Sequence, residues 1–127
     1  MQAKGAKKEE KNLKDLINEI NKKEEQIEDL SYVLSIIGGA SRIKILLLLY
    51  EVEELCPGDI GDALDISTPA ISQQLRRLRE AKLVKHKRRG KQVYYTLSPR
   101  ARGYVECLLS PILKGGNNLV HSSIDLF

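Results

Sequence analysis

The chain has 127 residues, enough for one domain with its own hydrophobic core. Its composition, 42% hydrophobic and 30% charged, is typical of a globular protein, and no apolar run approaches the ~20 residues of a membrane-spanning helix. The net charge of +4 is uneven, because residues 76–102 hold eleven Lys or Arg and one acidic residue, whereas the rest of the chain holds ten basic and sixteen acidic residues. This basic block indicates a surface for a polyanion, with a solvated basic face as the alternative.

The N-terminal part of the chain is predicted to form a short disordered basic segment, residues 1–8, and then one long helix over residues 9–37. Leu and Ile recur every seven residues along this helix, and a second apolar row lies three positions later, with Lys23 as its polar interruption. This heptad seam predicts homodimerisation, and a long helix that packs on its own core is the alternative. The seam residues are Leu13, Leu16, Ile20, Ile27, Leu30 and Leu34.

Two shorter helices are predicted next. The sequence GGAS at 38–41 ends the long helix, and Ser41 is expected to cap a helix with a buried apolar face. That face is expected to contain Ile43, Leu46, Leu47 and Tyr50. A third helix is predicted over residues 57–64, because Pro57 suits the first helical position and Asp59 lies in the first turn.

The sequence TPAISQQLRRLREAKL predicts a fourth helix, capped by Ser67 or Thr68. Ile71, Leu75 and Leu78 share one face, and the opposite face carries hydroxyl, amide and guanidinium groups, which contact bases and phosphates in a major groove. With the short helix and three-residue turn before it, this segment predicts a helix-turn-helix, and an ordinary polar helix face is the alternative. The predicted DNA-binding residues here are Ser67, Thr68, Pro69, Ser72, Gln73, Gln74, Arg76 and Arg77.

A β-hairpin is predicted directly after this helix. The segments 84–87 and 92–97 are rich in β-formers and flank RRGK, where Gly90 supplies the positive φ of a tight turn. A hairpin with a basic tip is a wing, which suits a phosphate backbone or a minor groove. The predicted DNA-binding residues of the wing are Lys87, Arg88, Arg89 and Lys91.

Pro99 is expected to open a final helix that ends at GGNN, residues 115–118, before a tail over 115–127. Its expected apolar face contains Tyr104, Val105, Leu108, Leu109 and Ile112, and Tyr104 and Leu108 are predicted to complete the dimer interface. The predicted fold is therefore mainly α with a small β-hairpin: a winged helix-turn-helix domain over residues 9–114, homodimeric through its first and last helices.

Residues 54–99, ELCPGDIGDALDISTPAISQQLRRLREAKLVKHKRRGKQVYYTLSP, resemble the ArsR/SmtB family of dimeric winged-helix repressors. The resemblance extends over roughly residues 30–113, and its motifs ELCxGD, PAISQQLRRLREAKLV and RRGKQVYY stand in the family's order. It implies a homodimer that binds a palindromic operator in double-stranded DNA, represses transcription and releases the operator when an inducer binds. In many members the inducer is a thiophilic or transition metal ion.

The resemblance carries over to the metal sites only in part. The family's site for arsenic, antimony or cadmium and lead is built on ELCxCD, and here Cys56 is present while Gly58 replaces the second cysteine. The family's second site, for zinc, cobalt or nickel, uses Asp and His along the last helix, where this chain has Pro99, Ala101 and apolar neighbours. The two histidines, His86 and His121, have no partner at metal-ligand spacing and are expected at the surface.

Cys56 and Cys107 are therefore the candidate sensing residues. Cys56 precedes a helix N-terminus, which favours a thiolate. Two thiolates can hold a soft metal ion such as mercury, arsenite or cadmium/lead, and no cofactor is expected for DNA binding itself. A disulfide or polysulfide bridge formed by a redox or reactive-sulfur sensor is the alternative. Both cysteines are equally compatible with plain packing, as in a family member with no metal inducer.

Other classes of function fit the sequence less well. We expect no enzyme, because no Cys/His pair, Gly-rich phosphate loop or HExxH motif is present in the sequence. A protein-interaction module would use the long helix but would leave the nearly acid-free polar face of residues 69–77 unexplained. The basic N-terminus lacks the apolar stretch of a secretory signal, and the two distant cysteines do not form a disulfide framework, so we expect a reducing cytoplasmic setting.

Overall fold

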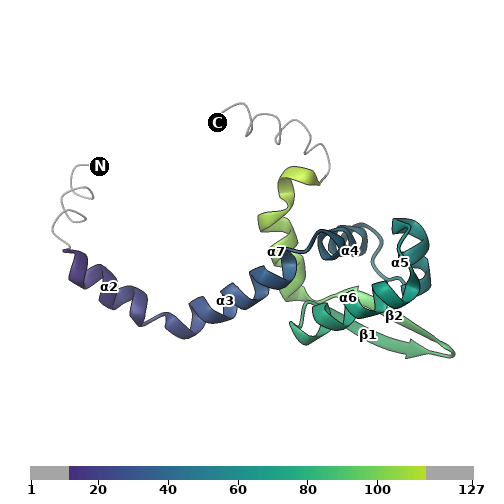
Figure 1. Ribbon diagram of the computed structural model, residues 1–127, viewed down its shortest axis with the longest axis horizontal. Coiled ribbons are helices and arrows are strands. Elements are labelled where there is room, and N and C mark those ends of the chain that lie inside the picture. The colour runs from purple at the N-terminus through teal and green to yellow at the C-terminus, as the bar shows by residue number, and fades with distance from the viewer. Residues whose placement is uncertain (1–11, 114–127) are drawn as a thin grey trace. The chain divides into compact units, whose positions relative to one another are not determined.

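The computed structural model describes residues 12–113, as nine helices and strands (Figure 1). The predictions of a disordered segment over residues 1–8 and of a tail over 115–127, with His121, lie outside the described residues. The chain divides after Leu34 into two compact units, which we describe separately.

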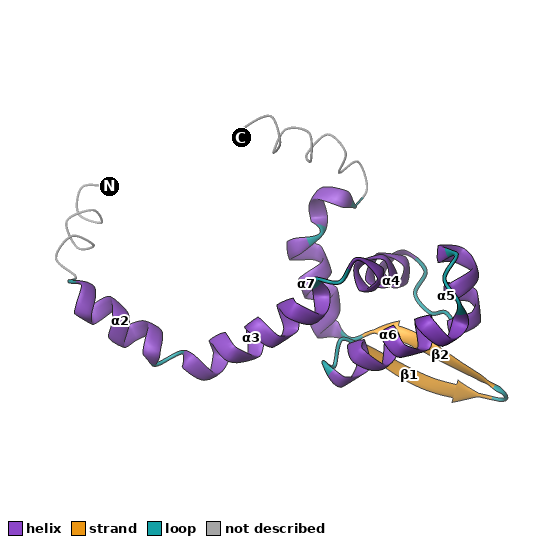
Figure 2. Cartoon of the chain, in the orientation of Figure 1, coloured by secondary structure: helices purple, strands orange, loops and turns teal. Residues whose placement is uncertain are grey.

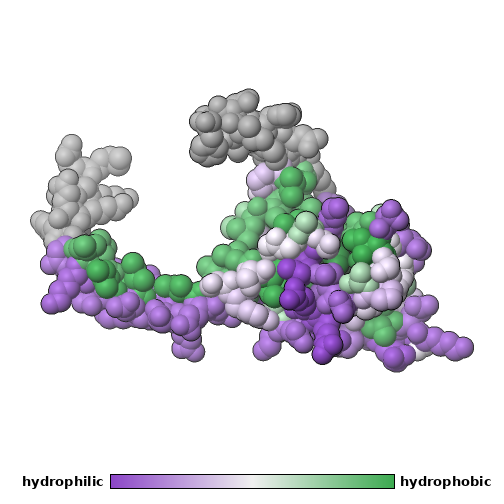
Figure 3. Space-filling model, in the orientation of Figure 1, coloured by the Kyte–Doolittle hydropathy of each residue, from purple (hydrophilic) through white to green (hydrophobic). Residues whose placement is uncertain are grey.

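The first unit contains α2 (Leu13–Asn21) and most of α3 (Glu24–Ile37). Asn12 caps α2, because its side-chain oxygen accepts a hydrogen bond from the backbone N–H of Asp15 at 2.8 Å. Apolar side chains line one side of α2, and polar side chains the other (Figure 3). The stripe on α2 and α3 is exposed: Leu13 is 71% exposed, and Ile20 is 55% exposed.

The prediction of one continuous helix over residues 9–37 is wrong, because a two-residue turn at 22–23 separates α2 from α3. At this turn the N–H of Lys23 bonds the carbonyl of Ile20, three residues back, at 2.9 Å. Asn21 is a poor helix former, and the Lys23 side chain adds no apolar contact at its seam position, so nothing there favours the regular helix. The register of the apolar rows continues on both sides of the turn.

The second unit contains a helical core and the hairpin (Figure 2). Its elements are α4 (Ala40–Glu51), α5 (Pro57–Leu64), α6 (Thr68–Glu80), β1 (Val84–Arg89), β2 (Gln92–Leu97), α7 (Pro99–Leu108) and the 3₁₀ helix η1 (Ser110–Ile112). Fully buried side chains from four of the helices and from the turn before β1 form the core. The helical ones include Ile45, Leu46, Leu49, Ile60, Ile71, Leu75, Leu78 and Val105, and the turn contributes Leu83. The fold is mainly α-helical with a two-stranded antiparallel sheet, as predicted.

Two helix ends differ from the prediction. Gly39, in extended backbone and without a side-chain cap, occupies the N-cap position of α4 that Ser41 was expected to fill, because the helix already begins at Ala40. The last helix ends at Leu108, and Ile112 lies in η1 instead of continuing its apolar face. Pro111 explains this end, since proline removes a backbone N–H and disfavours helical backbone at the residue before it.

The hairpin is held in register by its turn and by a short third segment. Arg89 pairs with Gln92 across the two-residue loop, and Gly90 adopts the expected positive φ of 63°. Leu55 joins the other edge of β2, because it exchanges two backbone hydrogen bonds with Tyr95, at 3.2 and 2.8 Å. The loop that contains Cys56 is therefore attached directly to the wing.

Among the described helices, none alone has the length and apolar character to cross a membrane; only α3 and α4 taken together as a bent pair pass such a test. Three residues in the middle and second half of α4 are buried in the helical core, namely Ile45, Leu46 and Leu49.

Candidate nucleic-acid interface

Helix α6 is fixed at its start and along its inner face. The Ser67 hydroxyl accepts a hydrogen bond from the N–H of Ala70 at 3.3 Å, so Ser67 is the N-cap, one of the two predicted alternatives. Ile71, Leu75 and Leu78, which share one face of the predicted helix, are fully buried. Gly61 of α5 lies close to the turn between α5 and α6, because a Cβ on it would be only 2.6 Å from the carbonyl oxygen of Ile66. The close approach of α5 to this turn therefore requires glycine.

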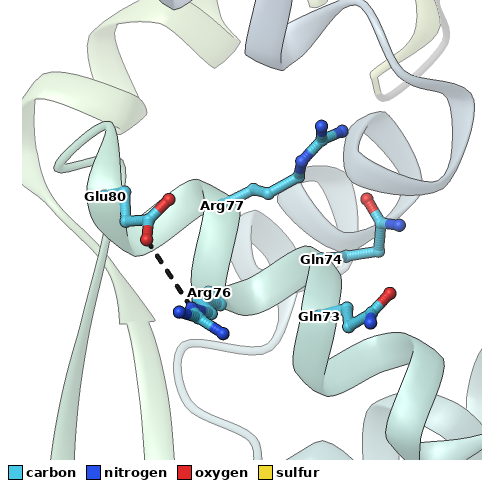
Figure 4. A pocket seen from close by; sticks show the side chains of 5 residues that line it. All are labelled: Gln73, Gln74, Arg76, Arg77 and Glu80. Carbon is cyan, nitrogen blue, oxygen red and sulfur yellow. Dashed lines mark ion pairs between the residues drawn. The ribbon is translucent and has the colours of Figure 1, made fainter.

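The outer face of α6 carries the predicted polar groups. Exposed residues on it and at its N-terminus are Ser67, Thr68, Pro69, Ser72, Gln73, Arg76 and Arg77. An open hollow of about 410 Å³ is lined by Gln73, Gln74, Arg76, Arg77 and Glu80 (Figure 4). Arg76 and Glu80 form an exposed ion pair at 3.6 Å, a geometry that contributes little to stability and leaves Arg76 available to a phosphate.

Gln74 differs from its neighbours, because it is half-buried. Its side-chain oxygen accepts a hydrogen bond from Nη1 of Arg42 in the first turn of α4, at 2.6 Å. The Nε–H of Arg42 also donates to the carbonyl of Ile36 at the end of α3. Arg42 is not among the residues predicted from the sequence, because its only local signal is a basic residue near a helix start.

The tip of the wing is exposed and basic, with Lys87, Arg88, Arg89 and Lys91 on it as predicted. Arg89 has two further contacts: its Nη2 lies 2.5 Å from Oε1 of Glu54, and its guanidinium carbon lies 4.0 Å from the ring centre of Tyr94. Glu54 belongs to the ELC segment, so an acidic group lies beside a predicted phosphate-binding group. Glu54 is not among the residues predicted from the sequence, because it is 35 residues away from Arg89 in the chain.

The two cysteines have different surroundings, and both are free. Cys56 is buried at the N-cap position of α5, and its thiol donates a hydrogen bond to Oδ2 of Asp59 at 3.1 Å. Cys107 is exposed on α7. Between residues 12 and 113 no group of three or more His, Cys, Asp or Glu side chains is arranged to hold a metal ion.

The surface of α7 around Cys107 carries one further polar contact. Tyr50 of α4 donates a hydrogen bond to Oε2 of Glu106 at 2.8 Å, and the guanidinium of Arg102 lies 5.0 Å from the Tyr50 ring centre. The hydrogen bond to the Glu106 carboxylate raises the pKa of the Tyr50 hydroxyl, with desolvation and the negative charge of Glu106 acting in the same direction. A separate aromatic contact lies in the wing, where exposed His86 stacks on Tyr95 with the two ring centres 5.7 Å apart.

Comparison with known proteins identifies relatives of this chain. Residues 40–86 match the model of the family described as bacterial regulatory protein, arsR family. The chain is 45% identical over 67 residues to the arsenical resistance operon repressor of Escherichia coli (strain K12), a match that covers 53% of this chain and 57% of that protein. It is 33% identical over 91 residues to the transcriptional repressor SdpR of Bacillus subtilis (strain 168), covering 71% of this chain and 100% of that protein.

Solved structures of other proteins superpose on this chain over most of their own length. Reduced HlyU from Vibrio cholerae N16961 superposes with a TM-score of 0.67 at 28% identity, covering 73% of this chain and 98% of that one. The transcriptional repressor BigR from Xylella fastidiosa gives a TM-score of 0.63 at 27% identity, covering 71% and 89%. The chain spans a little over half of the length of the Escherichia coli repressor. These relatives are regulatory proteins and not enzymes.

Proposed function

Because this chain belongs to the arsR family of bacterial regulatory proteins, we propose that it is a transcriptional repressor that binds double-stranded operator DNA as a homodimer and releases it when an inducer binds. The observation that carries this proposal is the exposed, nearly acid-free face of α6, held in one compact unit with the basic wing. Such a repressor acts in the cytoplasm, where its operator is.

In this proposal the DNA contacts are divided between two elements. Helix α6 enters the major groove, where Ser72 and Gln73 contact base edges and Arg76 and Arg77 contact phosphates or guanine. Ser67, Thr68 and Pro69 place the free N–H groups of the helix N-terminus against a phosphate. The wing residues Lys87, Arg88, Arg89 and Lys91 follow the neighbouring backbone or minor groove.

The dimer forms through the exposed apolar side chains of α2, α3 and α7. Leu16, Ile27, Leu30 and Leu34 are each between 42% and 45% exposed, more than a core helix of a single chain leaves uncovered. On α7, Leu108 is 43% exposed and Tyr104 is half-buried. A two-fold dimer of this kind places two α6 helices on a palindromic operator.

The inducer is a thiophilic ligand, with a soft metal ion such as mercury, arsenite or cadmium/lead as the first choice. Relatives named for arsenical and cadmium resistance support this choice. The described part of one protomer offers no three-ligand cluster, so Cys56 and Cys107 hold either an ion of low coordination number or a site shared between protomers. Oxidation by a reactive sulfur species is the alternative, and the exposure of Cys107 favours it over a buried metal site.

The proposal is tested by the binding of fluorescent duplex DNA at a series of salt concentrations. We expect sequence-dependent binding whose affinity falls steeply with salt, because phosphate contacts release counterions. The same complex, titrated with mercury(II), arsenite, cadmium and polysulfide, is expected to dissociate with at least one of them. Affinity for duplex DNA that is flat in salt contradicts the repressor, and a complex that resists every thiophile contradicts the inducer class alone.

A further inference from the structure

Arg42 connects three parts of the second unit. Its Nε–H donates to the carbonyl of Ile36, one of the carbonyls that the end of α3 leaves without a helical partner. Its Nη1 donates to Gln74 on α6 at 2.6 Å. Its guanidinium also lies against Gly39, where a Cβ would come within 2.5 Å of the Arg42 Cζ. The guanidinium is therefore fixed from three sides, and it is half-buried.

This contact determines which way the Gln74 carboxamide faces. A guanidinium has donors only, so the atom of Gln74 that faces Arg42 is the oxygen, and the amide nitrogen with its two N–H donors faces away. Gln74 lines the hollow on the outer face of α6 together with Gln73, Arg76 and Arg77 (Figure 4). The donors of Gln74 are therefore presented at the surface that the proposed function assigns to the major groove.

We infer that Arg42 is a positioning residue for DNA recognition, which holds Gln74 as a hydrogen-bond donor and so makes it read an acceptor edge, first of all N7 or O6 of guanine. A free glutamine pairs with adenine by donating to N7 and accepting from N6. That pairing needs the Gln74 oxygen, which Arg42 occupies and holds toward α4. This inference rests on the proposed function and adds to it the base preference of one position in each half-site.

The test is an in vitro selection from a pool of random-sequence duplexes with four proteins: the unchanged chain, Arg42→Met, Gln74→Ala and the double variant. Lys44→Met is the matched control, because it removes one positive charge from the exposed side of the same helix. We expect the unchanged chain to enrich guanine, roughly tenfold, at a position where Gln74→Ala loses the preference. Arg42→Met is expected to shift that position alone toward adenine, and the double variant to match Gln74→Ala.

Gly39→Ala gives the same test without removal of a charge. Gly39 has extended backbone (φ −78°, ψ 131°) that alanine tolerates, but the new methyl group would occupy the place of the guanidinium. We expect Gly39→Ala to change the base preference at the same position as Arg42→Met, with thermal unfolding measured in parallel to confirm folding.

The outcomes separate the inference from the proposed function. A uniform loss of affinity in Arg42→Met, with base preferences unchanged, reduces Arg42 to a structural role and overturns the inference. Enrichment of adenine by the unchanged chain at the Gln74-dependent position, or no effect of Gln74→Ala, overturns it as well. If instead the unchanged chain selects no common sequence, the proposed function itself fails.

Discussion

The carboxylate of Glu54 and the guanidinium of Arg89 lie 2.5 Å apart, so an acid from the ELC segment pairs with a basic residue of the wing. The pair is partly exposed, and its two side chains are 43% and 50% accessible. Exposed pairs of this kind stabilise a protein only slightly. The effect of this pair on DNA binding is expected to be larger, because in the proposed complex Arg89 exchanges Glu54 for a phosphate.

We therefore expect Glu54→Gln to tighten DNA binding by about two- to fivefold at low salt and to steepen the salt dependence by about one unit. Glu53→Gln is the matched control, because Glu53 is the exposed neighbouring acid and carries the same charge. Fluorescence anisotropy at several salt concentrations measures both quantities. Equal gains in the two variants would assign the effect to net charge and not to release of Arg89.

The wing and α6 are expected to contribute differently to recognition. Replacing Arg89 and Lys91 with alanine removes two phosphate contacts and should weaken binding to all DNA sequences, with a salt slope shallower by about two. Gln73→Ala should relax sequence preference, at a cost of about 1–3 kcal/mol for the preferred sequence, and leave the salt slope unchanged. Titrations with a selected and an unrelated duplex distinguish these results. Binding that survives both changes intact would contradict the assigned roles.

The apolar stripe of α2 and α3 predicts a self-association that a single charge should disrupt. Leu30→Glu puts a carboxylate into the exposed seam and is expected to shift the protein toward monomer, measured by sedimentation equilibrium. Glu28→Gln, on the same helix and exposed, is the control for a changed charge. Affinity for the operator should fall as the dimer dissociates, because a monomer binds only one half-site at a time. An unchanged mass for Leu30→Glu would place the interface elsewhere.

Much of this fold follows from local sequence signals. Pro57, Pro69 and Pro99 mark the starts of three helices, and Gly90 marks the hairpin turn, because each of these residues restricts or permits a particular backbone conformation. The Ser98 hydroxyl accepts from the N–H of Ala101 at the start of α7, the same local cap as at Ser67. Local propensity and burial agree in these segments.

Contacts between distant residues could not be predicted in this way. Arg42 with Gln74, and Glu54 with Arg89, are 32 and 35 residues apart, and a basic or acidic residue has many possible partners until the fold places one beside it. The break between α2 and α3 was missed for another reason, because the heptad spacing of Leu and Ile continues across it. Apolar periodicity reports which face of a helix is apolar and is insensitive to one irregular turn.

Cys56 is expected to act in release and not in DNA binding. Cys56→Ser keeps a donor for the carboxylate of Asp59 and a group of similar size, so affinity for DNA should be retained. Release by the effective thiophile should be lost, because the soft sulfur ligand is gone. Cys107→Ser, at the exposed thiol, shows whether the second sulfur is required. Normal release from Cys56→Ser by every thiophile tested would reduce Cys56 to a packing role.

Gly58 stands where the resembled family has the second cysteine of its ELCxCD motif, and the structure leaves room for one. A Cβ built on Gly58 meets no heavy atom within 4 Å, so Gly58→Cys is expected to fold with a second thiol near Cys56. We predict tighter arsenite binding, followed by thiolate-to-arsenic ultraviolet absorption, and release of DNA at lower arsenite concentration. Gly58→Ser is the control, because it adds a side chain of the same shape without a soft ligand. Equal arsenite responses from the two variants would show that the ELC segment does not hold the ion, and would move the inducer site toward Cys107.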